Sequence, residues 1–148
     1  MGEIRPTVRL ENISDRMRFK LGQIAENEIR AREVEAVADT GAVVTLLPQD
    51  LVEDLGLEIV AHRIVLLAND QKIELPLAAG IWLTVAGRSM STDCLVGPPG
   101  CEPLIGQIVM ENLDLIADPL KRTLTPRPES PYIPTVKMKE SRFASSAH

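Results

Sequence analysis

An aspartate stands in an apolar setting at Val37-Ala38-Asp39-Thr40-Gly41-Ala42. The run Ala42-Val43-Val44-Thr45-Leu46-Leu47 continues the apolar character on its far side. This pattern predicts a strand that delivers Asp39 into a turn and a second strand that leaves the turn. Gly41 suits the turn because glycine adopts tight backbone conformations. The tripeptide alone is a weak signal, since average composition produces Asp-Thr-Gly by chance in roughly a few per cent of chains this long.

A second short motif follows about 60 residues later. Leu104-Ile105-Gly106 joins two apolar residues to a glycine, and a short helix is predicted directly after it, from 107 to 112. A strand and a strong breaker precede this motif at Cys94-Leu95-Val96-Gly97-Pro98. The simplest alternative is that Asp39 forms only an Asx turn between two strands. The flanking apolar runs favour two linked motifs instead.

The rest of the sequence predicts short strands and few helices. A helix is expected from Pro48 to Leu55, with Gly56 as its stop. Asn69-Asp70-Gln71 is the expected tip of a hairpin, and Pro76 is expected at a sheet edge or a strand end. The predicted class is therefore all-β with one or two short helices. The expected strands cover residues 7–10, 34–37, 63–68, 72–77, 81–85, 92–96, 113–117 and 123–125.

Length and charge limit the organisation and the partners. A chain of 148 residues suits one domain with a real hydrophobic core, which we expect over residues 1–126. Prolines crowd the region after it, so residues 127–148 are expected to form a Pro-rich extended arm and a disordered tail. The net charge is −5 and the basic residues are interspersed with acidic ones. Phosphate binding needs clustered positive charge, so we expect no nucleic-acid partner.

Several signals are missing from the sequence. There is no signal-peptide pattern and no apolar run long enough for a bilayer, which predicts a soluble, cytoplasmic protein without a membrane partner. Cys94 and Cys101 are then expected to be free thiols. Because no His, Cys or Asp residues show metal-ligand spacing, we expect no metal and no cofactor.

Together the two motifs resemble those of the retropepsin-like aspartic peptidases, the family of retroviral proteases and their cellular and bacterial relatives. The similarity spans roughly residues 33–126. Leu46-Leu47-Pro48 and Leu55-Gly56-Leu57 are similar to the segment that follows the catalytic loop in many cellular members, which favours the cellular and bacterial branch. Leu113-Asp114-Leu115-Ile116-Ala117-Asp118-Pro119 resembles the usual exit strand. The resemblance implies a closed acid-protease-like barrel, a two-fold homodimer and aspartic endopeptidase activity.

The resemblance also implies roles for single residues. Asp39 would be the catalytic residue, and the Thr40 hydroxyl would bond across to the loop of the partner chain. The residues that would support the catalytic loop are Thr40, Gly41, Leu104, Ile105 and Gly106. A peptide substrate would contact Ala42, Leu66, Leu67, Asn69, Asp70 and Ile105.

The expected chemistry requires a second carboxylate. Peptide hydrolysis by this route uses a water held between two carboxylates that share one proton. The chain has one Asp-Thr-Gly, and Asp118 is followed by Pro119, so it offers no second catalytic loop. The second carboxylate must come from a second chain. Two alternatives stay open: a catalytically silent dimerisation or peptide-binding module of the same fold, and a domain that processes only a fused or operon partner.

Three features depart from the retroviral pattern. The expected hairpin tip contains no glycine, whereas retroviral flaps are glycine-rich. Gln107-Ile108 stands where retroviral enzymes carry an arginine followed by asparagine or aspartate. The first 30 residues and the Pro-rich end do not match the retroviral terminal strands. The sequence therefore leaves open how the hairpin meets a substrate and how the dimer is held together.

Overall fold

The structure is a computed structural model, and it describes residues 3–138. The tail expected at the end of the chain lies, from residue 139 onward, outside the described residues. The fold is mostly β with a few short helices, as the sequence predicts. The strands are β1 (Thr7–Asn12), β2 (Ala31–Glu35), β3 (Val37–Ala38), β4 (Leu46–Pro48), β5 (Glu58–Leu66), β6 (Lys72–Val85), β7 (Arg88–Gly97), β8 (Leu104–Ile105), β9 (Leu115–Asp118) and β10 (Thr123–Pro126).

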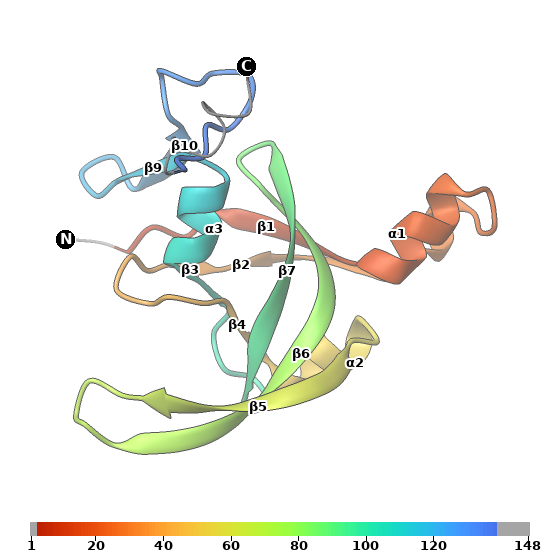
Figure 1. Ribbon diagram of the computed structural model, residues 1–148, viewed down its shortest axis with the longest axis horizontal. Helices are drawn as coiled ribbons and strands as arrows, with labels where there is room; N and C mark the ends of the chain where they lie inside the picture. Colours follow the sequence, from red (N-terminus) through yellow and green to blue (C-terminus); the bar gives the residue numbers. More distant parts are fainter. Residues whose placement is uncertain (1–2, 139–148) are drawn as a thin grey trace, which may run out of the picture.

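The main sheet curls into a half barrel (Figure 1). Its strands run in the order β2-β1-β6-β7-β4-β8-β3, with β5 paired to the free part of β6, while β9 and β10 form a separate two-stranded sheet. Alternate side chains of β1 and β6 point into the curl, because successive residues of a strand face opposite sides. Val8 and Leu10 of β1 and Ile81, Leu83 and Val85 of β6 are buried in this way.

Strand β6 is longer than the sequence indicates. The two stretches expected at 72–77 and 81–85 form one strand, with a pairing irregularity against β7 between Ala78 and Ile81. Gly80 has a φ of +94° inside this irregularity, and glycine adopts that value without steric cost. Pro76 pairs only with β5, because the pairing with β7 begins at Leu77. One side of β6 is therefore unpaired at Pro76, which agrees with the expected place at a sheet edge.

Helix α1 (Ile13–Lys20) corrects the prediction that only strands precede Asp39. Asn12 begins it by accepting a hydrogen bond from the Asp15 amide at 3.0 Å. The helix is polar, and Asp15 is its only buried residue. It therefore lacks the apolar stripe from which a helix is predicted in a sequence. With α2 (Gln49–Asp54) and α3 (Gln107–Asn112), the described residues hold three α-helices, one more than expected, and a short 3-10 turn at Glu26–Glu28.

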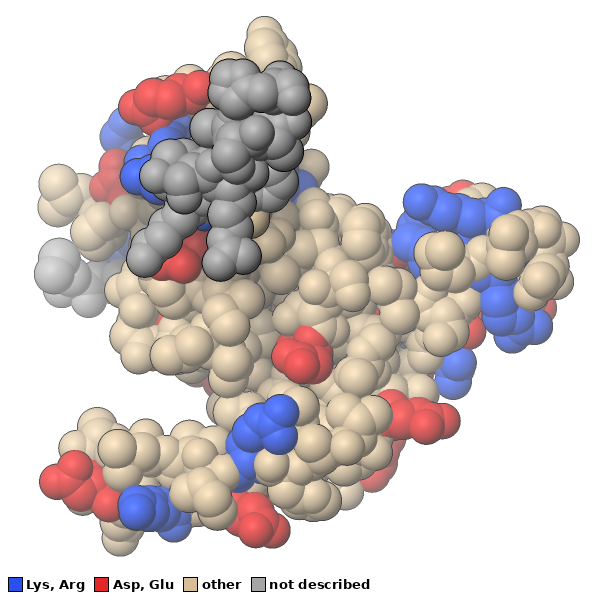
Figure 2. All heavy atoms as spheres, in the orientation of Figure 1, with Lys and Arg blue, Asp and Glu red and all other residues tan. Residues whose placement is uncertain are grey.

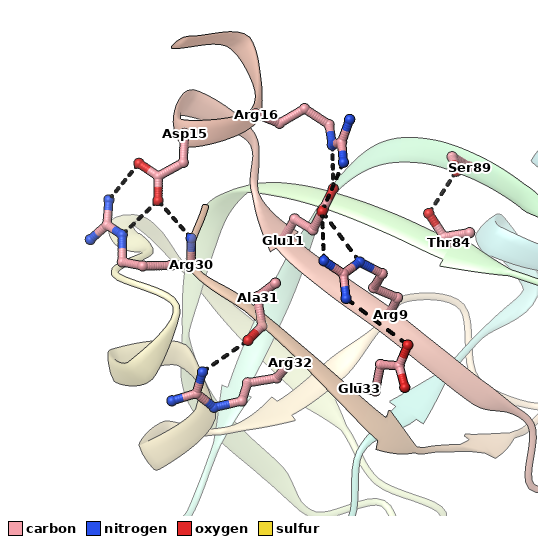
Figure 3. A network of polar contacts seen from close by, with 10 residues as sticks. All are labelled: Arg9, Glu11, Asp15, Arg16, Arg30, Ala31, Arg32, Glu33, Thr84 and Ser89. Carbon is pink, nitrogen blue, oxygen red and sulfur yellow. Dashed lines mark hydrogen bonds and ion pairs between the residues drawn. The ribbon is translucent and has the colours of Figure 1, made fainter. Parts of the chain in front are cut away.

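A polar network fixes α1 to the sheet (Figure 3). The Glu11 carboxylate is buried and accepts hydrogen bonds from Arg16 and Arg9, which lower its pKa, Arg16 more strongly. Asp15 accepts two hydrogen bonds from the Arg30 guanidinium, at 2.8 and 3.1 Å, and these lower its pKa. The helix projects to the right in Figure 1, on the side away from β3 and the segment that follows it. The network therefore supports the fold at a distance from Asp39.

The segment after β10 folds back onto the body around one carboxylate. Asp114 accepts hydrogen bonds from the Ser130 hydroxyl, from Arg127 Nε at 2.8 Å and from the Thr135 amide at 3.2 Å. Arg88, which is buried, donates to the carbonyls of Leu113, Asp114 and Ser130. We call residues 127–138 the arm. Up to Thr135 it is tied to the start of β9 by these bonds.

Acid should loosen the arm. The Ser130 hydroxyl and the Arg127 guanidinium lower the pKa of Asp114 to about 2 from an ordinary 3.8. A lowered pKa means that the folded state prefers the charged form, so this contribution to stability is complete above about pH 4 and is lost as the pH falls through about 2. Hydrogen exchange of the Thr135 amide, corrected for its intrinsic rate, should accelerate across that window. In Asp114→Asn this acid-dependent acceleration of exchange should vanish. If the variant shows the same acceleration, Asp114 is not the group that ties the arm at higher pH.

Candidate active site

The Asp39 turn and the Leu104-Ile105-Gly106 motif lie side by side. Strands β3 and β8 are parallel, with Val37 opposite Leu104 and Ala38 opposite Ile105. The Asp39 amide donates to the Ile105 carbonyl at 3.0 Å, and the Ala38 amide donates to the Ile4 carbonyl at 2.9 Å. The two motifs that the sequence separates by about 60 residues thus form one hydrogen-bonded unit.

The turn holds the Asp39 carboxylate at the surface. The Gly41 amide donates to Asp39 Oδ1 at 2.8 Å, and the Ala42 amide donates to the Asp39 carbonyl at 3.2 Å. Asp39 is half-buried, while Thr40 and Gly41 are exposed. Among the described residues, the Gly41 amide is the only donor to this carboxylate. One carboxylate oxygen is oriented by the turn and the other is available to a water, a substrate or another chain.

Gly106 is required by close packing rather than by its dihedral angles. Its φ of −108° is open to any residue. A β-carbon at this position would lie 2.6 Å from the Ala42 carbonyl oxygen and 2.8 Å from that of Val43. The next two amides, of Gln107 and Ile108, donate to these same carbonyls at 2.7 and 3.0 Å. The start of α3 therefore packs against the Asp39 loop, and a glycine at position 106 leaves room for this contact.

The residues expected to meet a substrate fall into two groups. Ala42 is half-buried in the loop, and Ile105 is 1% exposed and belongs to the core beneath it. Leu66, Leu67, Asn69 and Asp70 lie at the end of the β5–β6 hairpin. This hairpin and the segment after β3 extend to the same side in Figure 1, and Figure 2 shows an open notch above the hairpin. No hydrogen bond joins the described residues of the hairpin tip to those of the loop.

The hairpin tip forms at the expected place without a glycine. Asp70 takes a φ of +64°, which aspartate tolerates better than most residues. The Leu67 amide donates to the Gln71 carbonyl at 2.8 Å, and the Gln71 amide donates to Asn69 Oδ1 at 3.0 Å. The tip is thus a closed turn held by its own polar side chains.

Thr45 is a residue near the site that sequence reasoning missed. It is buried just after the Asp39 loop, and its carbonyl accepts a hydrogen bond from the Leu95 amide at 2.9 Å. Its hydroxyl has no hydrogen-bond partner among the described residues. A hydroxyl inside the apolar run 42–47 was the only signal in the sequence.

Replacing Thr45 by valine should stabilise the fold. The change keeps the shape of the side chain and removes a buried hydroxyl that gains no bond, so unfolding should cost about 1 kcal/mol more. Chemical denaturation of both forms measures the difference. Thr84→Val is the matched control, because the Thr84 hydroxyl contacts Ser89 Oγ at 2.6 Å and its loss should bring no such gain. A destabilised Thr45→Val would mean that the hydroxyl is satisfied.

Three further properties concern the described residues. Among residues 3–138, no group of three or more His, Cys, Asp or Glu side chains is arranged to hold a metal ion. No helix in this range is long and apolar enough to cross a membrane. Cys94 and Cys101 are both free thiols, and burial raises the pKa of Cys94 to about 12.

No known protein-family model matches the chain, and a search of curated proteins finds no match. The features available for a functional conclusion are therefore the curled, mostly β fold and the local geometry around Asp39.

Proposed function

We propose that the chain is one half of a retropepsin-like aspartic endopeptidase, active as a two-fold homodimer to which each chain contributes Asp39. The observation that carries the proposal is the hydrogen-bonded unit of the Asp39 turn and the Leu104-Ile105-Gly106 motif. It fixes a carboxylate at the surface of a curled β fold, with one oxygen held by the Gly41 amide. A purely structural Asx turn does not need the second motif packed beneath it.

The proposed reaction is hydrolysis of a peptide bond by a water held between two carboxylates. One carboxylate, charged, takes a proton from the water as general base, and the other, protonated, supports the developing oxyanion. As the C–N bond breaks, the protonated carboxylate supplies a proton to the leaving nitrogen. Thr40, beside the carboxylate and exposed, would bond to the loop of the partner chain and fix the distance between the two Asp39 residues.

The finer shape of the fold belongs to the same proposal. The closed acid-protease-like barrel would arise when the half barrel is completed in the dimer. An extended peptide would lie between the catalytic loops and the hairpins, bound by strand-like backbone hydrogen bonds. Ala42 and the hairpin residues Leu66, Leu67, Asn69 and Asp70 would contact it.

The closed hairpin tip favours a second candidate function. Glycine-rich flap tips bend easily, whereas this tip has no glycine and is held as one turn by the bonds of Leu67, Asn69 and Gln71. A dimerisation or peptide-binding module without catalysis would need no pliable flap. The further alternative, processing of a fused or operon partner only, would restrict the substrate rather than the mechanism.

Sedimentation and cleavage together test the proposal. At micromolar concentration the chain should sediment with about twice its mass of 16.2 kDa. It should cleave a denatured protein at acidic pH, and a pepstatin-type inhibitor should stop the cleavage. A dimer that binds peptides but never cleaves them would support the module. A monomer that cleaves at all dilutions would contradict the shared site.

A further inference from the structure

A groove runs from the catalytic loop along the arm. Its volume is about 920 Å³. Its lining includes Thr40, Ile108 and Glu111 of α3, and Val136 and Lys137 of the arm. Thr40, which directly follows Asp39 in the chain, therefore also lines this groove.

The walls of the groove are fixed before anything binds. Asp114 and Arg88 hold the arm through Arg127, Ser130 and Thr135. Helix α3 is held to the catalytic loop through its first two amides. A preformed surface binds at a lower entropic cost than a loose one.

The same region carries apolar side chains that the chain leaves uncovered. Tyr132 is 92% exposed and Ile133 is 76% exposed, between Pro131 and Pro134. Ile108, in the wall of the groove, is 44% exposed. Exposed aromatic and aliphatic side chains on a stiff bend are typical anchors of protein interfaces.

The arm and the β5–β6 hairpin both project from the half barrel, so the single chain offers surface that a partner can cover (Figure 1). A stable dimer needs to cover only about 800 Å² per chain.

We propose that this groove and the exposed bend of the arm form the dimer interface, so that the bound partner is a second copy of this chain. The inference rests on the proposed function. Two Asp39 carboxylates must come within about 3 Å of each other, and Thr40 lines the groove, so the second copy approaches this surface. A two-fold contact brings the same patch of each chain together. Glu111 and Glu129 with Lys137 give the patch both charge signs, as a self-complementary contact requires.

Charge placed on the patch should weaken the dimer. We suggest Ile108→Asp in the groove wall and Tyr132→Asp on the bend, both at side chains exposed in the single chain. Each should raise the dimer dissociation constant at least tenfold, as loss of an interface anchor does. Leu21→Asp is the matched control, because Leu21 is 69% exposed and follows α1 on the other side of the molecule. Its dissociation constant should equal that of the wild type.

Sedimentation over a range of concentrations, with thermal unfolding to confirm the fold, decides between the outcomes. If the variants dissociate and their cleavage returns as the concentration rises, the interface is supported. If both variants remain dimers like the wild type, this inference is overturned while the proposed function stands. If they lose cleavage but stay dimeric, the groove holds substrate instead, which also overturns it. If the wild type cleaves as a monomer, the proposed function itself fails.

Discussion

Asp39→Asn is expected to abolish peptide cleavage, by at least about a thousandfold, while leaving the sedimentation of the protein unchanged. The amide has nearly the shape of the carboxylate, so its oxygen can still accept the Gly41 amide hydrogen bond of 2.8 Å. It cannot take a proton from water. Because both chains of a homodimer carry the change, the site loses both carboxylates at once.

Asp118→Asn is the matched control for this variant. Asp118 ends β9 and accepts hydrogen bonds from the Leu120 and Lys121 amides at 3.0 and 3.1 Å. Like Asp39→Asn, this substitution removes one negative charge, but it lies outside the Asp39 loop. Cleavage should therefore persist. Both variants should be compared with the wild type from acidic to neutral pH. Wild-type cleavage by Asp39→Asn would overturn the aspartic-peptidase mechanism, and absence of cleavage by every form would favour the binding module.

Gly106→Ala is expected to destabilise the fold by about 3 kcal/mol and to remove most of the activity. The new methyl group would meet the Ala42 and Val43 carbonyls at 2.6 and 2.8 Å, far inside contact distance. These are backbone atoms, so they cannot move aside as a flexible side chain does. Either the loop shifts and moves Asp39, or α3 shifts and loses its two amide bonds to the loop. Denaturant unfolding and cleavage assays measure both effects.

A second glycine separates crowding from other effects of substitution. Gly87 has open space around its α-carbon and a φ of +76°, which asparagine tolerates. Gly87→Asn should therefore cost well under the loss expected at Gly106. At the N-cap of a helix, replacing a glycine by alanine without crowding costs about 1 kcal/mol or less. A loss that small in Gly106→Ala would contradict the close packing of Gly106 against the Ala42 and Val43 carbonyls.

Local patterns were sufficient for the elements that carry their own signal. The helices at 49–54 and 107–112 and the hairpin tip at 69–71 form where apolar spacing and turn residues place them. The strand expected to leave the Asp39 turn begins only at Leu46, because residues 42–45 form an irregular loop. Helix α1 was missed, since its only buried residue is Asp15 and its stability comes from a cap and from Arg30. Strand β6 was split in two, because Gly80 reads as a break although the sheet absorbs it as an irregularity.

The sequence by itself determined which residues can do chemistry: one Asp-Thr-Gly, its apolar setting and a second motif ending in glycine. It also limited a single chain to one aspartate in an Asp-Thr-Gly turn. Only the tertiary structure decided that Ile105 is buried under the loop, that the Thr45 hydroxyl has no partner among the described residues, and that the arm is tied to Asp114, which lines the same groove as Thr40. The physical reason is range. Turn and strand preferences act between neighbours in the chain, whereas burial and the bonds to Asp114 depend on residues that only folding brings together.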